Sequence, residues 1–404
     1  MDLKKSQSLD MRYACIHGFY WMTCCSMIGY ASVFLLNKGF SNSVIGIVLA
    51  LSNILAVVGQ PAVASYMDKA TKLTLRMMVS FVLVAIIVLS AVLLMVGNTS
   101  MLMLVLVVVV FTLMLTLQPF INSLTFVFEK QGIHINFGLA RGIGSVAYAV
   151  ISLILGNVVK TVSPNILPYF YIGLSMCMLA FVFTFYLPGH KNDLDHEEVK
   201  NETGEKISLM SFVKKYKSFM IMLIATVLLF VDHSIINNFF IQVVNHIGGT
   251  ASDMGNAIFL AAVLELPTMA LFMKIQTKIG CHKMMLIAAI FFSVKHVLTY
   301  FAVNMFMIYA AQVIQMFAYA VFIPASVYYI SQLVESSDLV KGQALMTGAM
   351  TLAGVFSSLV GGILLDELGV SHVLLIGAII SVLGTVCMFF GVENVDQKKN
   401  EISQ

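Results

Sequence analysis

The chain has 404 residues, of which 59% are hydrophobic and 11% are charged, and its mean hydropathy is +0.94. A soluble domain carries roughly a quarter charged residues, so this composition excludes an ordinary water-soluble protein and indicates the lipid bilayer as its surroundings. The net charge of +3 is too small to indicate a nucleic-acid partner. The six cysteines form no C-x-x-C pair and lie mostly in apolar stretches, which argues against disulfides and metal sites.

Stretches of about twenty apolar residues, long enough to cross a bilayer as helices, recur along the chain. The first is too long for a cleavable signal peptide and leads directly into further spans. The first six predicted spans are 12–36, 43–67, 73–97, 101–128, 138–159 and 168–187. The second six are 218–245, 253–275, 283–301, 304–332, 343–365 and 370–392. The sequence therefore predicts an all-α membrane protein with twelve transmembrane helices in two six-helix bundles.

A polar interval separates the two sets of spans. Gly189–Lys217 contains six acidic residues and six lysines, a composition typical of a solvated linker, with one short amphipathic piece at Leu209–Tyr216. The predicted domains are an N-terminal bundle 1–188, a linker 189–217, a C-terminal bundle 218–393 and a tail 394–404.

Basic residues predict the orientation in the membrane. With the N-terminus inside, twenty lysines and arginines fall on the inner side, whereas only Lys38 and Lys160 fall on the outer side. Because cytoplasmic loops are enriched in basic residues, both termini and the linker are expected in the cytoplasm, and the protein in the cell membrane.

The two halves also share a motif. G-x-A-x-x-x-G begins at Gly138 in span five and again at Gly342 in span eleven. Small residues at such intervals let helices approach closely in lipid. Two parallel six-helix halves are the arrangement in which a substrate site forms near the middle of the membrane.

Three stretches, 29–69, 128–148 and 238–317, carry a more specific pattern of glycines, aromatic residues and charges. The second stretch is the most specific, because it combines Phe128-Glu129-Lys130 with Arg141 and Tyr148. Together the stretches resemble the major facilitator superfamily, and within it the branch of lactose permease and related oligosaccharide and nucleoside proton symporters. The resemblance implies secondary active transport of a polar small solute by alternating access, with the proton as coupling ion.

Arg141 and Tyr148 lie seven residues apart in span five, which places them two turns apart on one helical face. A guanidinium offers a fork of donors suited to paired hydroxyls, and a phenol ring offers a flat face to a sugar ring or a base. The resemblance implies that both residues bind the substrate. An alternative remains open, in which Arg141 pairs with Glu129 as an anchor and Tyr148 only packs.

Charged side chains inside a membrane cost about 2.5–3.5 kcal/mol each, so each one requires an explanation. Glu265 lies in mid-span two residues before Pro267, a residue type that bends helices. The resemblance implies that Glu265 contacts the substrate, and its carboxyl group is the first candidate for proton coupling. An ion pair with Lys295 on the following span is the alternative, and the two roles are compatible.

Asp232 and His233 are adjacent in span seven, so only one of them needs to face a cavity. Asp232 is expected to pair with Lys295, either for proton coupling or as a structural salt bridge, and both interpretations stay open. Asn238 continues a polar stripe on the same span and is a candidate substrate contact.

The chain also departs from the lactose permease pattern. Gln315 and Ala318 stand where that pattern has a proton-handling histidine and glutamate. Thr125 stands in place of a substrate-binding glutamate, and Lys295 in place of an arginine. These departures argue against lactose as the substrate, require a proton path through other groups and leave a uniporter open. Gln315 itself is a candidate substrate contact.

Weaker candidates for substrate contact lie on spans one and four. His17 and Trp21 are one turn apart on span one, which lines the cavity in this fold, and Asn122 lies on span four. For Trp21, anchoring at the membrane interface is the alternative.

The segment from Asp68-Lys69 to Arg76 is similar to the inner-loop motif of the superfamily. That resemblance implies a role in gating and not in substrate contact.

Other classes of function are less consistent with the sequence. Motifs of hydrolases, zinc proteases and phosphate-binding loops are lacking, so neither an enzyme nor a cofactor is expected. An efflux antiporter for drugs or metabolites and a non-transporting membrane sensor remain alternatives. The partners expected are the lipid bilayer and a small-molecule substrate, and the functional form is expected to be a monomer.

Overall fold

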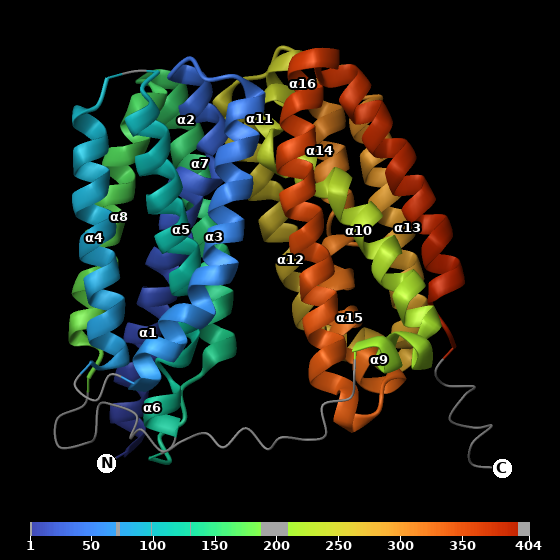
Figure 1. Ribbon diagram of the computed structural model, residues 1–404, viewed down its shortest axis with the longest axis horizontal. Coiled ribbons are helices and arrows are strands. Elements are labelled where there is room, and N and C mark those ends of the chain that lie inside the picture. The colour runs from blue at the N-terminus through green and yellow to red at the C-terminus, as the bar shows by residue number, and fades with distance from the viewer. Residues whose placement is uncertain (1, 70–72, 98, 130, 187–208, 395–404) are drawn as a thin grey trace. The chain divides into compact units, whose positions relative to one another are not determined.

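The computed structural model describes residues 2–69, 73–97, 99–129, 131–186 and 209–394. In these ranges the chain is helical, and no strand is present. The chain divides into two compact units, Met1–Val199 and Lys200–Gln404 (Figure 1). The predicted linker lies outside the described residues as far as residue 208, and the predicted tail lies outside them from residue 395 on.

The N-terminal unit is a bundle of long apolar helices. Its helices, in chain order, are α1 (Asp2–Cys24), η1 (Cys25–Gly29), α2 (Ala31–Asn37), α3 (Asn42–Lys69), α4 (Leu75–Met95), α5 (Met101–Ser123), α6 (Phe126–Glu129), α7 (Phe137–Thr161), η2 (Pro164–Ile166) and α8 (Leu167–Thr184). Helix α1 packs against α7 and α8, and α5 packs against α3 and α4. Their apolar side chains form the core of the unit, as a lipid-exposed bundle requires.

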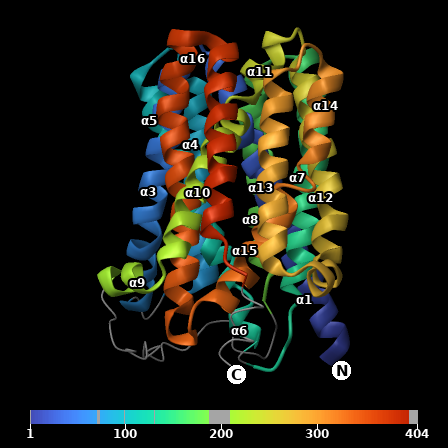
Figure 2. The same ribbon diagram turned by 90° about the vertical axis from the view of Figure 1, so that its right-hand side faces the viewer.

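The C-terminal unit begins with the short helix α9, which confirms the predicted amphipathic piece at Leu209–Tyr216. Its helices are α9 (Leu209–Lys215), α10 (Lys217–Asn238), α11 (Phe240–His246), α12 (Ala251–Ile279), α13 (Cys281–Tyr300), α14 (Met305–Ile314), α15 (Tyr319–Leu333), η3 (Ser336–Asp338) and α16 (Leu339–Gly391). Helix α16 runs along α10 and also packs against α13, which itself packs against α15 (Figure 2).

The described residues contain ten helices that are long and apolar enough to cross a membrane, or eleven if the bent pair in span one is counted as one crossing. Helix α16 has 53 residues and would be about 80 Å long if straight, more than twice the hydrocarbon thickness of a bilayer. It bends at Gly369, whose φ of 77° is a conformation that glycine adopts without steric cost. Helix α16 therefore supplies two crossings. The described helices are thus consistent with twelve spans.

Asp366 and Glu367 lie within α16 near its bend, where only Gly369 departs from helical geometry. Both acidic side chains are exposed, so they can be solvated without an interruption of the helix.

Three spans are interrupted where no interruption was expected. Span one contains the π-helical turn η1 and bends by 41° before α2. Span seven breaks at Phe239, between α10 and α11, and span ten breaks at 315–318, between α14 and α15. Pro267, by contrast, lies inside the continuous helix α12, so this proline does not end its helix. Such interruptions free backbone groups inside the membrane and are common at functional positions.

Candidate functional site

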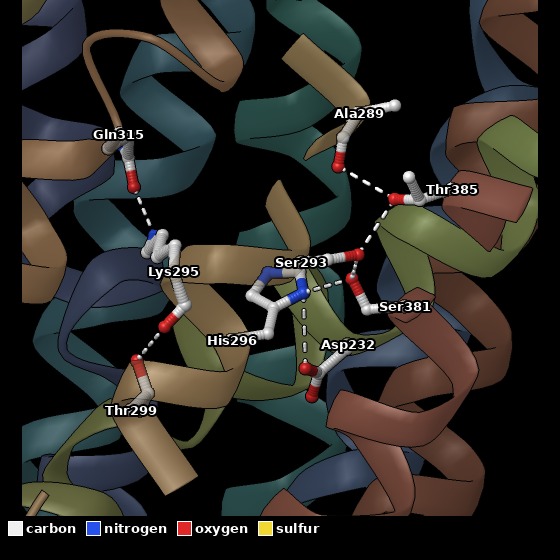
Figure 3. A network of polar contacts seen from close by, with 9 residues as sticks. All are labelled: Asp232, Ala289, Ser293, Lys295, His296, Thr299, Gln315, Ser381 and Thr385. Carbon is white, nitrogen blue, oxygen red and sulfur yellow. Dashed lines mark hydrogen bonds and ion pairs between the residues drawn. The ribbon is translucent and has the colours of Figure 1, made fainter. Parts of the chain in front are cut away.

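Three polar side chains of the C-terminal unit are connected by hydrogen bonds. Lys295 of α13 donates a hydrogen bond from Nζ to Oε1 of Gln315, and Nε2 of Gln315 donates to Oε1 of Glu265 on α12 (the first of these bonds is seen in Figure 3). Lys295 is fully buried, whereas Glu265 and Gln315 are partly exposed. The expected relation of Glu265 to Lys295 is therefore made through Gln315.

The position of Gln315 explains why it can reach both partners. It is the first residue after α14, at the start of the interruption in span ten. An amide carries an acceptor and two donors, so one side chain can face a cation with its oxygen and a carboxylate with its nitrogen. The arrangement joins helices α12 and α13 to the break between α14 and α15 through two charge-assisted hydrogen bonds.

A second polar network joins α10, α13 and the second half of α16 (Figure 3). Nδ1 of His296 lies 3.2 Å from Oδ2 of Asp232 and 2.8 Å from Oγ of Ser381. Ser381 and Ser293 are 3.1 Å apart at their hydroxyls, and Ser293 lies 2.7 Å from the hydroxyl of Thr385. The basic side chain within ion-pair distance of the Asp232 carboxylate is His296, and the pairing of Asp232 with Lys295 stays a prediction.

Close packing fixes Asp232 in this network. The side chain is fully buried against Gly377 of α16, and a Cβ at that position would overlap the carboxylate. His233, the next residue on α10, points to different partners: its Nε2 is 3.0 Å from Nδ2 of Asn237, and its ring stacks on Tyr319 with centroids 5.3 Å apart. Adjacent residues on a helix face different directions, as the sequence led us to expect.

In the N-terminal unit, three predicted residues meet along α1 and α7. The guanidinium of Arg141 lies 4.2 Å from the centre of the Trp21 ring, a cation–π contact, and donates a hydrogen bond of 2.8 Å to Ser145. Tyr148 meets the same indole edge to face, with centroids 6.4 Å apart. Trp21 can lie this close to α7 because Gly144 has no side chain there. The predicted shared face of Arg141 and Tyr148 is therefore organised around Trp21.

The weaker candidates are placed elsewhere. His17 is buried between the rings of Tyr13 and Phe137, at 4.7 and 5.7 Å, and neither ring nitrogen has a hydrogen-bond partner. Asn122 is partly buried, and its backbone carbonyl accepts a 3.2 Å hydrogen bond from Tyr13.

On α10, Asn238 donates a 2.8 Å hydrogen bond from Nδ2 to Ser358 of α16. Asn238 is the last residue of α10 and therefore lies beside the break in span seven.

The predicted gating residues lie at the end of α3 and the start of α4. Arg76 sits 5.5 Å from the ring centre of Tyr186, another cation–π contact. Asp68 and Lys69 end helix α3, and their side chains lie outside the described residues.

A polar cluster outside the membrane spans fixes α9 to the loop between α15 and α16. Lys215 lies 2.7 Å from Glu335 and 3.3 Å from Asp338, and Tyr216 donates a 3.0 Å hydrogen bond to Asp338. Burial raises the pKa of Asp338, but the bonds from Tyr216 and Lys215 and the charge of nearby Lys341 outweigh it and hold that pKa below its usual value. The bond to Glu335 is the main cause that raises the pKa of Lys215.

Some of these residues were missed in the sequence. Ser293, Ser381 and Thr385 are ordinary small residues in apolar helices, and nothing in the pattern distinguished them. Two local spacings carry a signal in retrospect: Ser381 and Thr385 are four residues apart, and Ser293 and His296 are three apart, so each pair shares one helical face.

The fold and the buried charges together define a membrane transporter of the major facilitator type. Residues 11–376 match the model of the MFS_1 like family, and the chain belongs to that family.

Two curated relatives are transport proteins. The chain is 24% identical to a maltose permease of Geobacillus stearothermophilus over 356 residues, which are 86% of this chain and 85% of that protein. It is also 24% identical to the uncharacterized transporter YwbF of Bacillus subtilis over 266 residues. That second match covers 65% of this chain and less than two thirds, 63%, of YwbF.

Solved structures show the same fold at low sequence identity. A mutant form of the nucleoside transporter NupG matches with a TM-score of 0.79 and 14% identity over 95% of this chain and 100% of that one. A bacterial homologue of the human lysosomal transporter Spinster, facing inward and unoccupied, matches with a TM-score of 0.67 and 10% identity over 96% and 97%.

Proposed function

We propose that this protein imports a polar small solute, a sugar, an oligosaccharide or a nucleoside, in symport with protons. The maltose permease relative and the fold shared with a nucleoside transporter support this class of substrate. The main support for proton coupling is the hydrogen-bonded set of Lys295, Gln315 and Glu265, because it supplies a titratable acid and a cation on separate helices.

The substrate side of the proposal rests on the face of Arg141, Trp21 and Tyr148. Arg141 is exposed, so its donors are accessible to a ligand. An indole ring suits the apolar face of a sugar or the plane of a base, and a guanidinium fork suits vicinal hydroxyls. Both features favour a hydroxylated solute over a purely apolar one.

The coupling side follows from the orientation of the Gln315 amide. Its oxygen faces the ammonium of Lys295 and its nitrogen faces the carboxylate of Glu265, which is the orientation that the two charges favour. When Glu265 takes up a proton, its charge is lost, the Gln315–Glu265 hydrogen bond weakens, and Lys295 loses the counter-charge that acts on it through Gln315. In this model the change permits the loaded carrier to reorient.

The test is a paired measurement with Glu265→Gln. A thermal-shift screen of the purified protein against sugars and nucleosides first identifies a ligand, which is then used in proteoliposomes. The variant should lose accumulation driven by a pH gradient but keep exchange between equal pools, because glutamine mimics the protonated acid. Glu367→Gln, an exposed change on α16, is the control and should behave like the parent.

Three results would contradict the proposal. Intact pH-driven accumulation in Glu265→Gln would exclude Glu265 from coupling. Uptake in the parent that ignores the pH gradient and only equilibrates the substrate would exclude proton symport and favour a uniporter. Substrate movement opposite to the direction of proton flow would favour an efflux antiporter.

A further inference from the structure

The network around Asp232 and His296 contains buried polar atoms that the Lys295–Gln315–Glu265 chain does not use. Asp232 and His296 are both 0% exposed, and Lys295 lies beside His296 in the same helix. Neither carboxylate oxygen of Asp232 has an aligned hydrogen bond, although His296 Nδ1 is 3.2 Å from Oδ2. Nε2 of His296 also has no partner. A buried carboxylate without hydrogen bonds is costly unless a cation lies against it.

The hydroxyl groups beside His296 fix where its proton lies. Thr385 donates its only hydroxyl proton to the backbone carbonyl of Ala289, at 2.7 Å, so its oxygen accepts from Ser293. Ser293 has then used its proton and must accept from Ser381. Ser381 in turn must accept from His296, which requires a proton on Nδ1 of the imidazole (Figure 3).

This order leaves one nitrogen of His296 for a second proton. With Nδ1 protonated and facing both Ser381 and Asp232, the lone pair of the neutral ring is on Nε2. Catalytic triads use the same relation, in which a carboxylate orients an imidazole through Nδ1 and leaves Nε2 as the base. Here the carboxylate and the imidazole are buried inside the C-terminal unit.

We propose that Asp232 and His296 form a second proton-binding site within the C-terminal unit, separate from Glu265. A hydronium ion gives its proton to the lone pair of His296 Nε2 and leaves as water, and release reverses the step. Binding converts a buried carboxylate beside a neutral ring into an ion pair of zero net charge. The two states differ in the net charge of the unit by one, which is the property that a coupling or pH-sensing site requires.

The surrounding titratable groups are few. On the same two helices they are Lys295 and His233, whose ring lies 6.3 Å from that of His296. Tyr319 of α15 stacks on His233, and Glu265 of α12 is reached from Lys295 through Gln315. Ser381 and Thr385 are the groups that α16 contributes, and neither titrates. The positive charge of Lys295 opposes proton uptake at His296, and the negative charge of Asp232 favours it.

Direct observation of the histidine tests the site without any substrate. In the purified full chain, labelled with ¹⁵N-histidine, His296 should show the Nδ1–H tautomer at high pH and the imidazolium at low pH, between about pH 8 and pH 5. The signal is assigned by its absence in His296→Gln, and His372→Gln, an exposed change, is the control. An Nε2–H tautomer, or no change over this range, would overturn the proposal.

Two further variants separate the parts of the site. Asp232→Asn should abolish the imidazolium signal in the same pH range, because the counter-charge is gone. If that variant fails to fold, Ser381→Ala supplies the test, because it keeps both titratable groups. It leaves Asp232 as the acceptor at Nδ1, so the Nδ1–H tautomer and the imidazolium are both expected to persist, and loss of the imidazolium signal in this variant would contradict the role of Asp232.

The role of this site in transport rests on the proposed function, but its existence does not. If Glu265→Gln shows that Glu265 is not the coupling residue while His296 titrates as expected, the second site stands and becomes the candidate for coupling. If His296 does not titrate, the second site is excluded, whatever the outcome at Glu265.

Discussion

At the scale of single residues, the buried titratable side chains of the C-terminal unit are contacted by two chemically different kinds of group. The amide of Gln315 faces Lys295 with its oxygen and Glu265 with its nitrogen, so the strength of each hydrogen bond depends on the charge of that partner. Hydroxyl groups instead form an ordered row beside His296 that ends on a backbone carbonyl and fixes one tautomer. Loss of the charge on Glu265 would weaken its hydrogen bond to Gln315. The hydroxyl row instead keeps the lone pair of neutral His296 on Nε2, where it can accept a proton.

Arg141 is the residue at which substrate recognition can be tested by a minimal change. Arg141→Lys keeps the positive charge but removes the fork that reaches both the Trp21 face and Ser145. Losing one charge-assisted hydrogen bond costs about 1.5–3 kcal/mol, so apparent affinity should fall roughly tenfold or more. The measurement is substrate uptake at matched expression, with Lys160→Arg on the same helix as control. Uptake equal to that of the parent would favour the anchor interpretation of Arg141.

At the scale of elements, the long apolar runs were predictable because a membrane leaves the backbone few choices other than a continuous helix. The interruptions were not predictable. Prolines 61, 119, 267 and 324 all lie inside helices, whereas the breaks near Phe239 and Gln315 contain no proline. At the second break, Gln315 contacts residues of helices that are distant in sequence, and such contacts cannot be read from local patterns. The same reason explains the site: seven-residue spacing predicted the face of Arg141 and Tyr148, but no spacing relates His296 to Asp232 and Ser381.

The docking of α9 is an element-scale feature with a pH signature. Asp338 has a lowered pKa in the folded state, so its stabilising effect is present above its ordinary pKa of about 3.9 and is lost as the pH falls through the folded-state value. Lys215 has a raised pKa, so its effect is present below its ordinary value of about 10.4 and is lost at higher pH. The cluster should therefore stabilise the C-terminal unit across the whole range between these limits.

Asp338→Asn tests this cluster by thermal unfolding. At neutral pH the melting temperature should fall by about 2–4 °C, since the carboxylate that accepts from Tyr216 and Lys215 becomes neutral. As the pH falls through the lowered pKa of Asp338, the parent becomes protonated as well, so the difference should shrink. Glu367→Gln, which is exposed on α16, should leave the melting temperature unchanged at both pH values. A constant difference at all pH values would show that packing, and not charge, holds α9.

At the scale of the whole molecule, the orientation in the membrane is a prediction from charge alone, and it is open to direct test. Twenty basic residues fall on the predicted inner side against two on the outer side, and cytoplasmic loops retain such residues. Reporter fusions at Lys4, Glu202 and Lys399 should therefore report the cytoplasm, and fusions at Lys38 and Lys160 the opposite side. The linker fusion at Glu202 is the most informative, because an odd number of crossings in the N-terminal unit would move it outside. A signal at Glu202 from outside, with Lys4 still inside, would exclude the six-plus-six arrangement, whereas inversion at every position would keep the fold and reverse only its orientation.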